Sequence, residues 1–111
     1  MRLRSDMFVS ALMRRVFGEG GFAAIERRGM EEAGAIFIRQ RFRDGLETLY
    51  GPAPQSLVDD EGAASRRFEL RLDRAEPQAL EALMEREVRF DPDLWLVEIE
   101  TDRLDDLLTL V

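Results

Sequence analysis

The chain has 111 residues, of which 45% are apolar and 35% are charged, so it is long enough to bury one hydrophobic core as a single domain (residues 1–111). All 16 basic residues are arginine, and neither cysteine nor histidine occurs. These absences exclude disulfides, Ser-His-Asp and Cys-His catalysis, thiolate metal sites and lysine Schiff bases within the chain.

The net charge of −7 is unevenly distributed along the chain. Residues 1–56 carry 9 arginines and 7 acidic residues, whereas residues 57–111 carry 7 arginines and 16 acidic residues. Because an acidic surface repels phosphate backbones, we do not expect a nucleic-acid partner. The alternative would need a basic face formed by four arginines, namely Arg14, Arg15, Arg27 and Arg28.

The chain shows no sign of secretion or membrane insertion. Arginines interrupt the apolar run near the N-terminus, and no stretch approaches the ~20 apolar residues of a membrane span. We therefore expect a cytoplasmic protein without membrane contact. We also expect no cofactor, because the glycines at 18, 20 and 21 follow a helix rather than a strand, the wrong order for a dinucleotide fingerprint.

The N-terminal part of the chain predicts a helix over residues 5–17. Its apolar residues recur at i, i+4 and i+8 on two adjoining rows, which makes one broad apolar face. These residues are Phe8, Val9, Leu12, Met13, Val16 and Phe17. Ser5 is a suitable N-cap, Asp6 lies at the positive end of the helix dipole, and Gly18 ends the helix.

Three strands are predicted next, at residues 22–29, 33–42 and 46–52. The second and third are joined through Asp44-Gly45, and Asp-Gly is a strong hairpin signal. The third strand ends at Pro52, because proline cannot continue a central ladder.

Residues 55–65 are expected to form a polar loop that carries the acidic cluster Asp59-Asp60-Glu61. The cluster lacks the ligand spacing of an EF-hand loop, which argues against calcium. A fourth strand follows at residues 66–73. Its alternation predicts that Phe68, Leu70 and Leu72 share one buried face.

A second helix is predicted from Pro77, because proline is favoured in the first turn. The inner stripe of this helix is formed by Leu80, Leu83, Met84 and Val88. Glu85 and Arg89 are spaced for an i,i+4 ion pair. The stretch LWLVEIE at residues 94–100 has apolar residues on both faces, which predicts a strand covered on both sides.

Residues 101–111 are predicted to form a third helix. Its acidic first turn suits a helix N-terminus. Its apolar face consists of Leu104, Leu107, Leu108 and Val111. We expect this face to dock on the domain or to mediate self-association with a second copy of the chain.

The predicted element order is α-β-β-β-β-α-β-α. Adjacent strands joined by short loops favour an antiparallel meander. The predicted fold class is therefore α+β, with a mainly antiparallel sheet of about five strands and helices packed on it.

Asp91 and Asp93 flank Pro92 just before the only tryptophan, Trp95. In one interpretation, Asp91 ends the second helix and the side chains bond the turn backbone, because aspartate and proline are typical of turns. In the other, the two carboxylates bind a cation or act as a general base, although hard cations need about six oxygen ligands. We favour the structural interpretation.

A second set of candidates comes from the strands. Glu98 and Glu100 share one face of the last strand, where perturbed carboxylates could line a cleft or simply emerge into solvent. Arg39 and Arg41 share one face of the second strand, and Arg67 and Arg71 share one face of the fourth, so these arginines could form an anion-binding patch. Tyr50 is a further candidate if the protein binds a small ligand. In the interpretation that we favour, acidic residues of other strands pair with the arginines. The expected pairing residues are Glu26, Glu47 and Glu69.

Several stretches resemble a small alphaproteobacterial family of unknown function. They are ALMRRV, GGFAAIERRG leading to AGAIFI, LYGPAPQ and REVRFDPDLWLVEIE, and together they span most of the chain. The resemblance implies a stand-alone bacterial domain, and it implies no activity and no catalytic residue.

The sequence thus favours a non-enzymatic interaction or regulatory module, because the usual nucleophiles and bases are missing. The alternative is a small-ligand-binding protein or an enzyme that uses carboxylates and arginines. This alternative predicts a concave pocket that joins the YGPAP loop to the FDPD turn.

Overall fold

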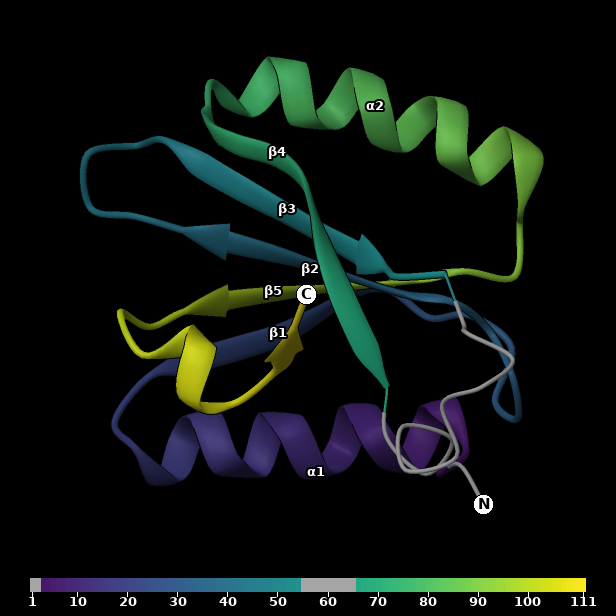
Figure 1. Ribbon diagram of the computed structural model, residues 1–111, viewed down its shortest axis with the longest axis horizontal. Coiled ribbons are helices and arrows are strands. Elements are labelled where there is room, and N and C mark those ends of the chain that lie inside the picture. Colours follow the sequence, from purple (N-terminus) through teal and green to yellow (C-terminus); the bar gives the residue numbers. More distant parts are fainter. Residues whose placement is uncertain (1–2, 55–65) are drawn as a thin grey trace.

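A computed structural model describes residues 3–54 and 66–111 (Figure 1). The elements are α1 (Ser5–Gly18), β1 (Phe22–Arg27), β2 (Ile36–Arg41), β3 (Glu47–Pro52), β4 (Arg67–Ala75), α2 (Pro77–Phe90), β5 (Trp95–Glu100), the 3-10 turn η2 (Leu104–Asp106) and β6 (Thr109–Leu110). The predicted α+β class is therefore confirmed. The polar loop predicted at 55–65 and its acidic cluster lie outside the described residues.

The described strands form one mixed sheet in the order β1-β5-β2-β3-β4-β6. β5 runs parallel to β2, and β6 runs parallel to β4, whereas the other three pairs are antiparallel. All five predicted strands are present and most of the pairs are antiparallel, but the sheet is mixed, gains the short sixth strand β6 and does not form the predicted meander. The reason lies in β5, whose two apolar faces can both be buried only in the interior of the sheet, so it is inserted between β1 and β2.

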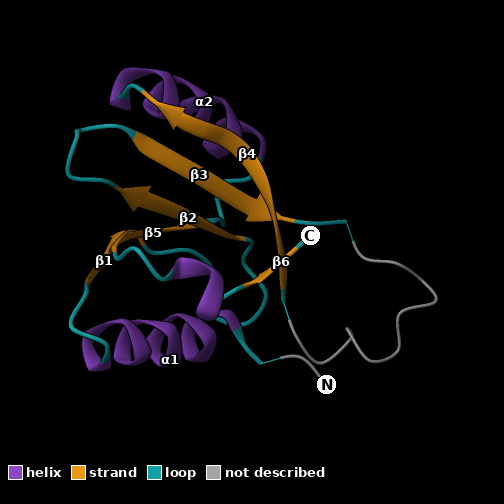
Figure 2. Ribbon diagram, turned by 60° about the vertical axis from the view of Figure 1, so that its left-hand side comes forward, coloured by secondary structure: helices purple, strands orange, loops and turns teal. Residues whose placement is uncertain are grey.

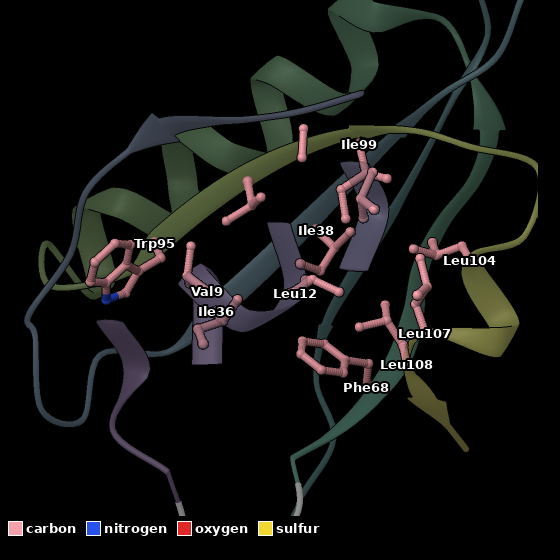
Figure 3. Packing of buried hydrophobic residues seen from close by; sticks show 13 residues of the cluster. Val9, Leu12, Ile36, Ile38, Phe68, Trp95, Ile99, Leu104, Leu107 and Leu108 are labelled. Carbon is pink, nitrogen blue, oxygen red and sulfur yellow. The ribbon is translucent and has the colours of Figure 1, made fainter. Parts of the chain in front are cut away.

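The two helices cover opposite faces of the sheet (Figures 1 and 2). On the α1 face, Trp95 and Ile99 pack with α1 in a large apolar cluster (Figure 3). On the α2 face, Leu96 packs with Leu80 and Met84 of α2. The prediction that residues 94–100 are covered on both sides is confirmed, with Trp95 at 0% exposure and its Nε1 donating a 2.9 Å hydrogen bond to the carbonyl of Met30.

The Asp-Gly turn joins β2 and β3 as predicted. Gly45 adopts a φ of 87°, which glycine reaches without steric cost, and the carboxylate of Asp44 accepts a 3.0 Å hydrogen bond from the backbone N–H of Leu46. The turn therefore fixes the register of the hairpin.

β4 departs from the predicted alternation. Phe68 is 1% exposed and packs on the α1 face, but Leu70 is 51% exposed and Leu72 packs on the α2 face. Successive residues of β3, Leu49 and Tyr50, pair with Leu72 and Leu70, so β4 carries one extra residue between them. This bulge turns Leu72 to the opposite face, which the sequence pattern alone does not reveal.

The helix predicted at residues 101–111 is wrong. The chain makes the single 3-10 turn η2 and then pairs with β4 as β6, where the N–H of Val111 donates to the carbonyl of Phe68. Leu104, Leu107 and Leu108 are at most 7% exposed in the chain's own core, because a single turn already brings residues at i, i+3 and i+4 together. Self-association of the chain stays a prediction, and these three leucines are already buried within one copy.

Candidate functional site

The α2 face of the sheet carries a cluster of charged side chains centred on two arginines of β2. The Nε of Arg39 donates a 2.8 Å hydrogen bond to Glu47, and its Nη1 lies 3.1 Å from a carboxylate oxygen of Glu26. The Nε of Arg41 lies 2.9 Å from a carboxylate oxygen of Glu47, and its Nη1 lies 3.1 Å from a carboxylate oxygen of Glu98. We call these five residues the ion-pair cluster.

The sheet register explains why the cluster forms. Arg39 is the ladder partner of Glu98 in β5, and Arg41 is the partner of Glu47 in β3. Glu26 lies on edge strand β1, across β5 from β2. Alternate residues of each strand point to the same face, so four strands deliver their charges to one place.

Burial, hydrogen bonds and neighbouring charges shift the pKa values of two groups in the cluster, Glu98 and Arg39. Burial raises the pKa of Glu98, and its hydrogen bond with Glu26 raises it further, while the charge of Arg41 acts in the opposite direction. Burial lowers the pKa of Arg39, but the hydrogen bond and charge of Glu47 and the charge of Glu26 more than offset this, and the net direction is upward. The cluster therefore contains a permanently charged arginine beside a carboxyl group that holds its proton more tightly than usual.

The structure brings some of the predicted candidates together. Arg39, Arg41 and Glu98 belong to the ion-pair cluster, and Glu100 is close enough for its charge to affect Glu98. The predicted pairing of Glu26 and Glu47 with the arginines is confirmed. Glu69 instead lies 3.1 Å from Arg71 in its own strand.

The remaining candidates lie elsewhere. Asp91 is the C-cap of α2, and its carboxylate accepts a 3.1 Å hydrogen bond from the backbone N–H of Asp93, so the structural interpretation of this turn accounts for Asp91. Tyr50 packs against the α1-face core, away from the ion-pair cluster. The C-terminal end of β3 and the start of β5 lie at the same end of the sheet (Figure 1). However, Asp91, Asp93 and Tyr50 line neither the groove between α2 and β1 nor the hollow where β1 begins and β5 ends.

A groove of about 580 Å³ runs between α2 and β1. Its apolar lining is formed by Leu80, Met84, Val88 and Leu96, and its charged lining by Glu26, Arg27, Arg39, Glu81, Glu85 and Arg89. The groove exists because α2 packs on β3 and β4 and leaves part of β5 and β1 uncovered (Figure 2). One wall is an apolar stripe of α2 with a charged rim that repeats every four residues.

Sequence reasoning missed this groove. The sequence prediction placed Leu80, Met84 and Val88 on the core-facing stripe of the second helix. It did not use the fact that a charged residue follows each of them, at positions 81, 85 and 89. That repeat is the sequence signal for a stripe at the edge of a packed face rather than at its centre.

A second, more polar hollow of about 440 Å³ lies where β1 begins and β5 ends. Its lining includes Phe22, Arg41, Arg43, Glu100 and Arg103. Across residues 3–54 and 66–111, no group of three acidic side chains is placed to hold a metal ion. None of the described helices is long and apolar enough to cross a bilayer.

Solved structures similar to this chain include three that cover most of its length. It is 66% identical to protein Atu0922 from A. tumefaciens, whose solution structure gives a TM-score of 0.89 over 100% of this chain and 96% of that chain. A DUF1491 family protein from Caulobacter crescentus CB15 is 33% identical in its crystal structure, with a TM-score of 0.73 over 91% of this chain and 88% of that chain. An NMR structure of a DUF1491 family protein from the same organism is 32% identical, with a TM-score of 0.77 over 100% and 98% of the two chains.

A family model described as "Protein of unknown function (DUF1491)" matches residues 3–109. No curated protein matches the sequence. The predicted resemblance to an alphaproteobacterial family of unknown function is thereby confirmed.

Proposed function

The chain belongs to the DUF1491 family of unknown function, and we propose that it is a non-enzymatic interaction module whose partner binds in the groove between α2 and β1. The observation that carries this proposal is the groove itself, an apolar stripe of α2 bordered by charged side chains. Partner sites commonly combine an apolar centre with a polar rim.

The ion-pair cluster supports a structural role for the charges rather than catalysis. The side chains of Arg39 and Glu47 are 6% and 5% exposed and bond to each other, so a substrate would have to break a buried ion pair to reach them. The cluster, two of whose members line the groove, therefore has the properties of a structural element of the groove wall rather than those of a set of reactive groups. The alternative is an enzyme that uses these carboxylates and arginines. The pairing argues against it, because the main candidate residues are already bound to one another.

The shape of the groove favours a polypeptide over a small ligand. Its volume of about 580 Å³ would suit either, but it is an open surface groove rather than an enclosed cavity. Small-molecule sites usually enclose most of the ligand surface, whereas peptides are often bound in open grooves. We propose that the module acts in the cytoplasm as a single domain, and that self-association is separate from groove binding.

Site-specific photo-crosslinking in bacterial cells tests the proposed function. A photoreactive amino acid is placed at position 85, on the groove rim, or at position 82, an exposed position of α2 outside the groove lining. We expect a discrete protein adduct from position 85 and none from position 82. The same adducts from both positions, or no adduct from position 85, would contradict groove binding.

A further inference from the structure

We propose that Arg27 and Arg89 form a carboxylate clamp at one end of the groove, and that the partner is an amphipathic peptide segment whose acidic residue binds there. This inference rests on the proposed function and specifies the chemistry of the partner. The apolar side chains of the segment lie against Leu80, Met84 and Val88, and its carboxylate reaches the two guanidinium groups.

The two arginines lie at the same end of the groove because of the chain reversal between α2 and β5. Arg89 lies in the last turn of α2. The chain then turns through residues 91–94 into β5, where Leu96 is the ladder partner of Arg27. Both arginines line the groove, and this end is opposite the end where Glu81 approaches Arg39 at 3.5 Å.

Arg27 is held in position without being neutralised. Its Nη2 donates a 2.8 Å hydrogen bond to the backbone carbonyl of Pro92, and its Nε is buried without a hydrogen-bond partner among the described residues. The bulge between Ile25 and Arg27 in β1 aims this side chain beside the start of β5. A fixed guanidinium loses little conformational entropy when a carboxylate binds.

Arg89 is also without an acidic partner in the described part of the chain. The i,i+4 pair that the sequence predicts between Glu85 and Arg89 is not among the ion pairs of the described residues. By contrast, Arg39, Arg41, Arg71 and Arg74 each lie within ion-pair distance of a carboxylate. In a chain of net charge −7, two uncompensated arginines at one end of an apolar groove form a local basic site.

The groove polarity sets the charge pattern of the occupant. One end presents Arg27 and Arg89, whereas the rim towards the other end carries Glu81 and Glu85. The wall from Leu80 to Val88 spans about 12 Å at the rise of an α-helix, which matches roughly three to four residues of an extended peptide. The complementary segment is thus short, apolar in its middle and acidic at the arginine end.

Selection from a phage-displayed library of random decapeptides tests the clamp on the whole chain. The wild-type protein, the variant with Arg27→Glu and Arg89→Glu, and a control with Arg14→Glu and Arg86→Glu are used as baits. The control makes the same charge change at exposed positions outside the groove. Circular dichroism and the unfolding midpoint confirm that each bait is folded.

We expect the wild-type and control baits to enrich peptides with apolar residues and an adjacent Asp or Glu. The Arg27/Arg89 variant should lose these peptides and enrich Lys or Arg at the same position. Replacing the selected acidic residue by its amide should weaken binding about tenfold, the size of one charge-assisted hydrogen bond. Amide chemical shifts should move along α2 and β1.

The outcomes separate the two proposals. If the folded wild-type bait enriches no peptide, or if the bound peptides shift residues outside the groove, the proposed function fails and the clamp fails with it. If peptides bind in the groove without an acidic preference, or if charge reversal at Arg27 and Arg89 leaves that preference unchanged, only the clamp is overturned.

Discussion

Arg39 occupies the interior of the sheet with 6% of its side chain exposed and contacts Glu26, Glu47 and Glu81. Removing ions from water costs several kcal/mol each, so such a group is tolerated only where its partners are fully engaged. A buried ion pair adds little net stability, because the cost of desolvating the two charges offsets much of their attraction. The identity of these partners depends on which strands are neighbours, so the sequence could suggest the pairs but not their burial.

Replacing one member of this pair should be far more harmful than replacing both. We expect Arg39→Met to lower the free energy of unfolding by about 3–5 kcal/mol, because it leaves Glu47 buried without its partner. The double variant with Glu47→Leu should recover much of the loss. Urea unfolding of the three proteins measures this, and additive losses would show that the two side chains act independently.

Glu98 should give the protein an unusual dependence on pH. Because its pKa is raised in the folded state, the folded protein binds more protons than the unfolded one between the ordinary value of 4.5 and the higher folded pKa. The contribution of Glu98 to stability is therefore present below pH 4.5 and is lost as the pH rises through the folded pKa.

We expect Glu98→Gln to remove this loss while keeping a hydrogen-bonding side chain beside Glu26. The difference in unfolding free energy between variant and wild type should grow in favour of the variant as the pH rises from acid to neutral. Glu85→Gln, on the exposed groove rim, is the control. A difference that stays constant with pH would argue against a raised pKa at Glu98.

At the scale of elements, local signals and long-range pairing determined different features. Both helices, the Asp44-Gly45 hairpin and the two-sided burial of β5 follow from local patterns, and the sequence predicted them. The C-terminal segment did not follow its leucine spacing, because the edge of β4 offered backbone partners that a third helix could not use. The bulge in β4 and the position of Arg27 likewise depend on strand pairing, which the periodicity of one segment does not contain.

The C-terminal segment yields a direct test of its role in the core. We expect Leu107→Ala to destabilise the protein by about 2–5 kcal/mol, because Leu107 is 6% exposed within the α1-face cluster. Val111→Ala should change stability by no more than about 0.5 kcal/mol, because Val111 is 67% exposed. Thermal unfolding measures both, and sedimentation at two concentrations checks whether either variant changes the assembly state.

Over the whole molecule, β5 is an interior strand that joins the two ends of the sequence in the sheet, with β1 and β2 on its sides and apolar clusters on both of its faces. The fold class could be predicted because alternation and helix spacing are local. The strand order could not, because it joins residues that are far apart in the sequence, such as Ile36 and Trp95, which are about 60 positions apart. The groove could not be predicted either, because it forms where α2 leaves part of the sheet uncovered, and this depends on how the helix packs on the sheet.

Hydrogen exchange should rank the strands by their place in the sheet. Amides of β5 and β2 should exchange only through global unfolding, whereas those of β6, which has two residues at the edge, should exchange first.

The fluorescence emission of Trp95 should be blue-shifted and poorly quenched by acrylamide in the folded state, because its side chain is fully buried. Fast exchange in β5, or ready quenching of Trp95, would contradict the described core.

The late position of β5 in the sequence also has a consequence for the nascent chain on the ribosome. β1 pairs with no described strand except β5, although about 70 residues separate their starting points in the sequence. Until residues 95–100 have emerged, β1 lacks its described partner strand and the α1-face cluster lacks Trp95, Val97 and Ile99, so the translated N-terminal part exposes apolar surface to chaperones and proteases. A message cut short before Trp95 should therefore yield a polypeptide that the cell degrades rather than a smaller folded protein.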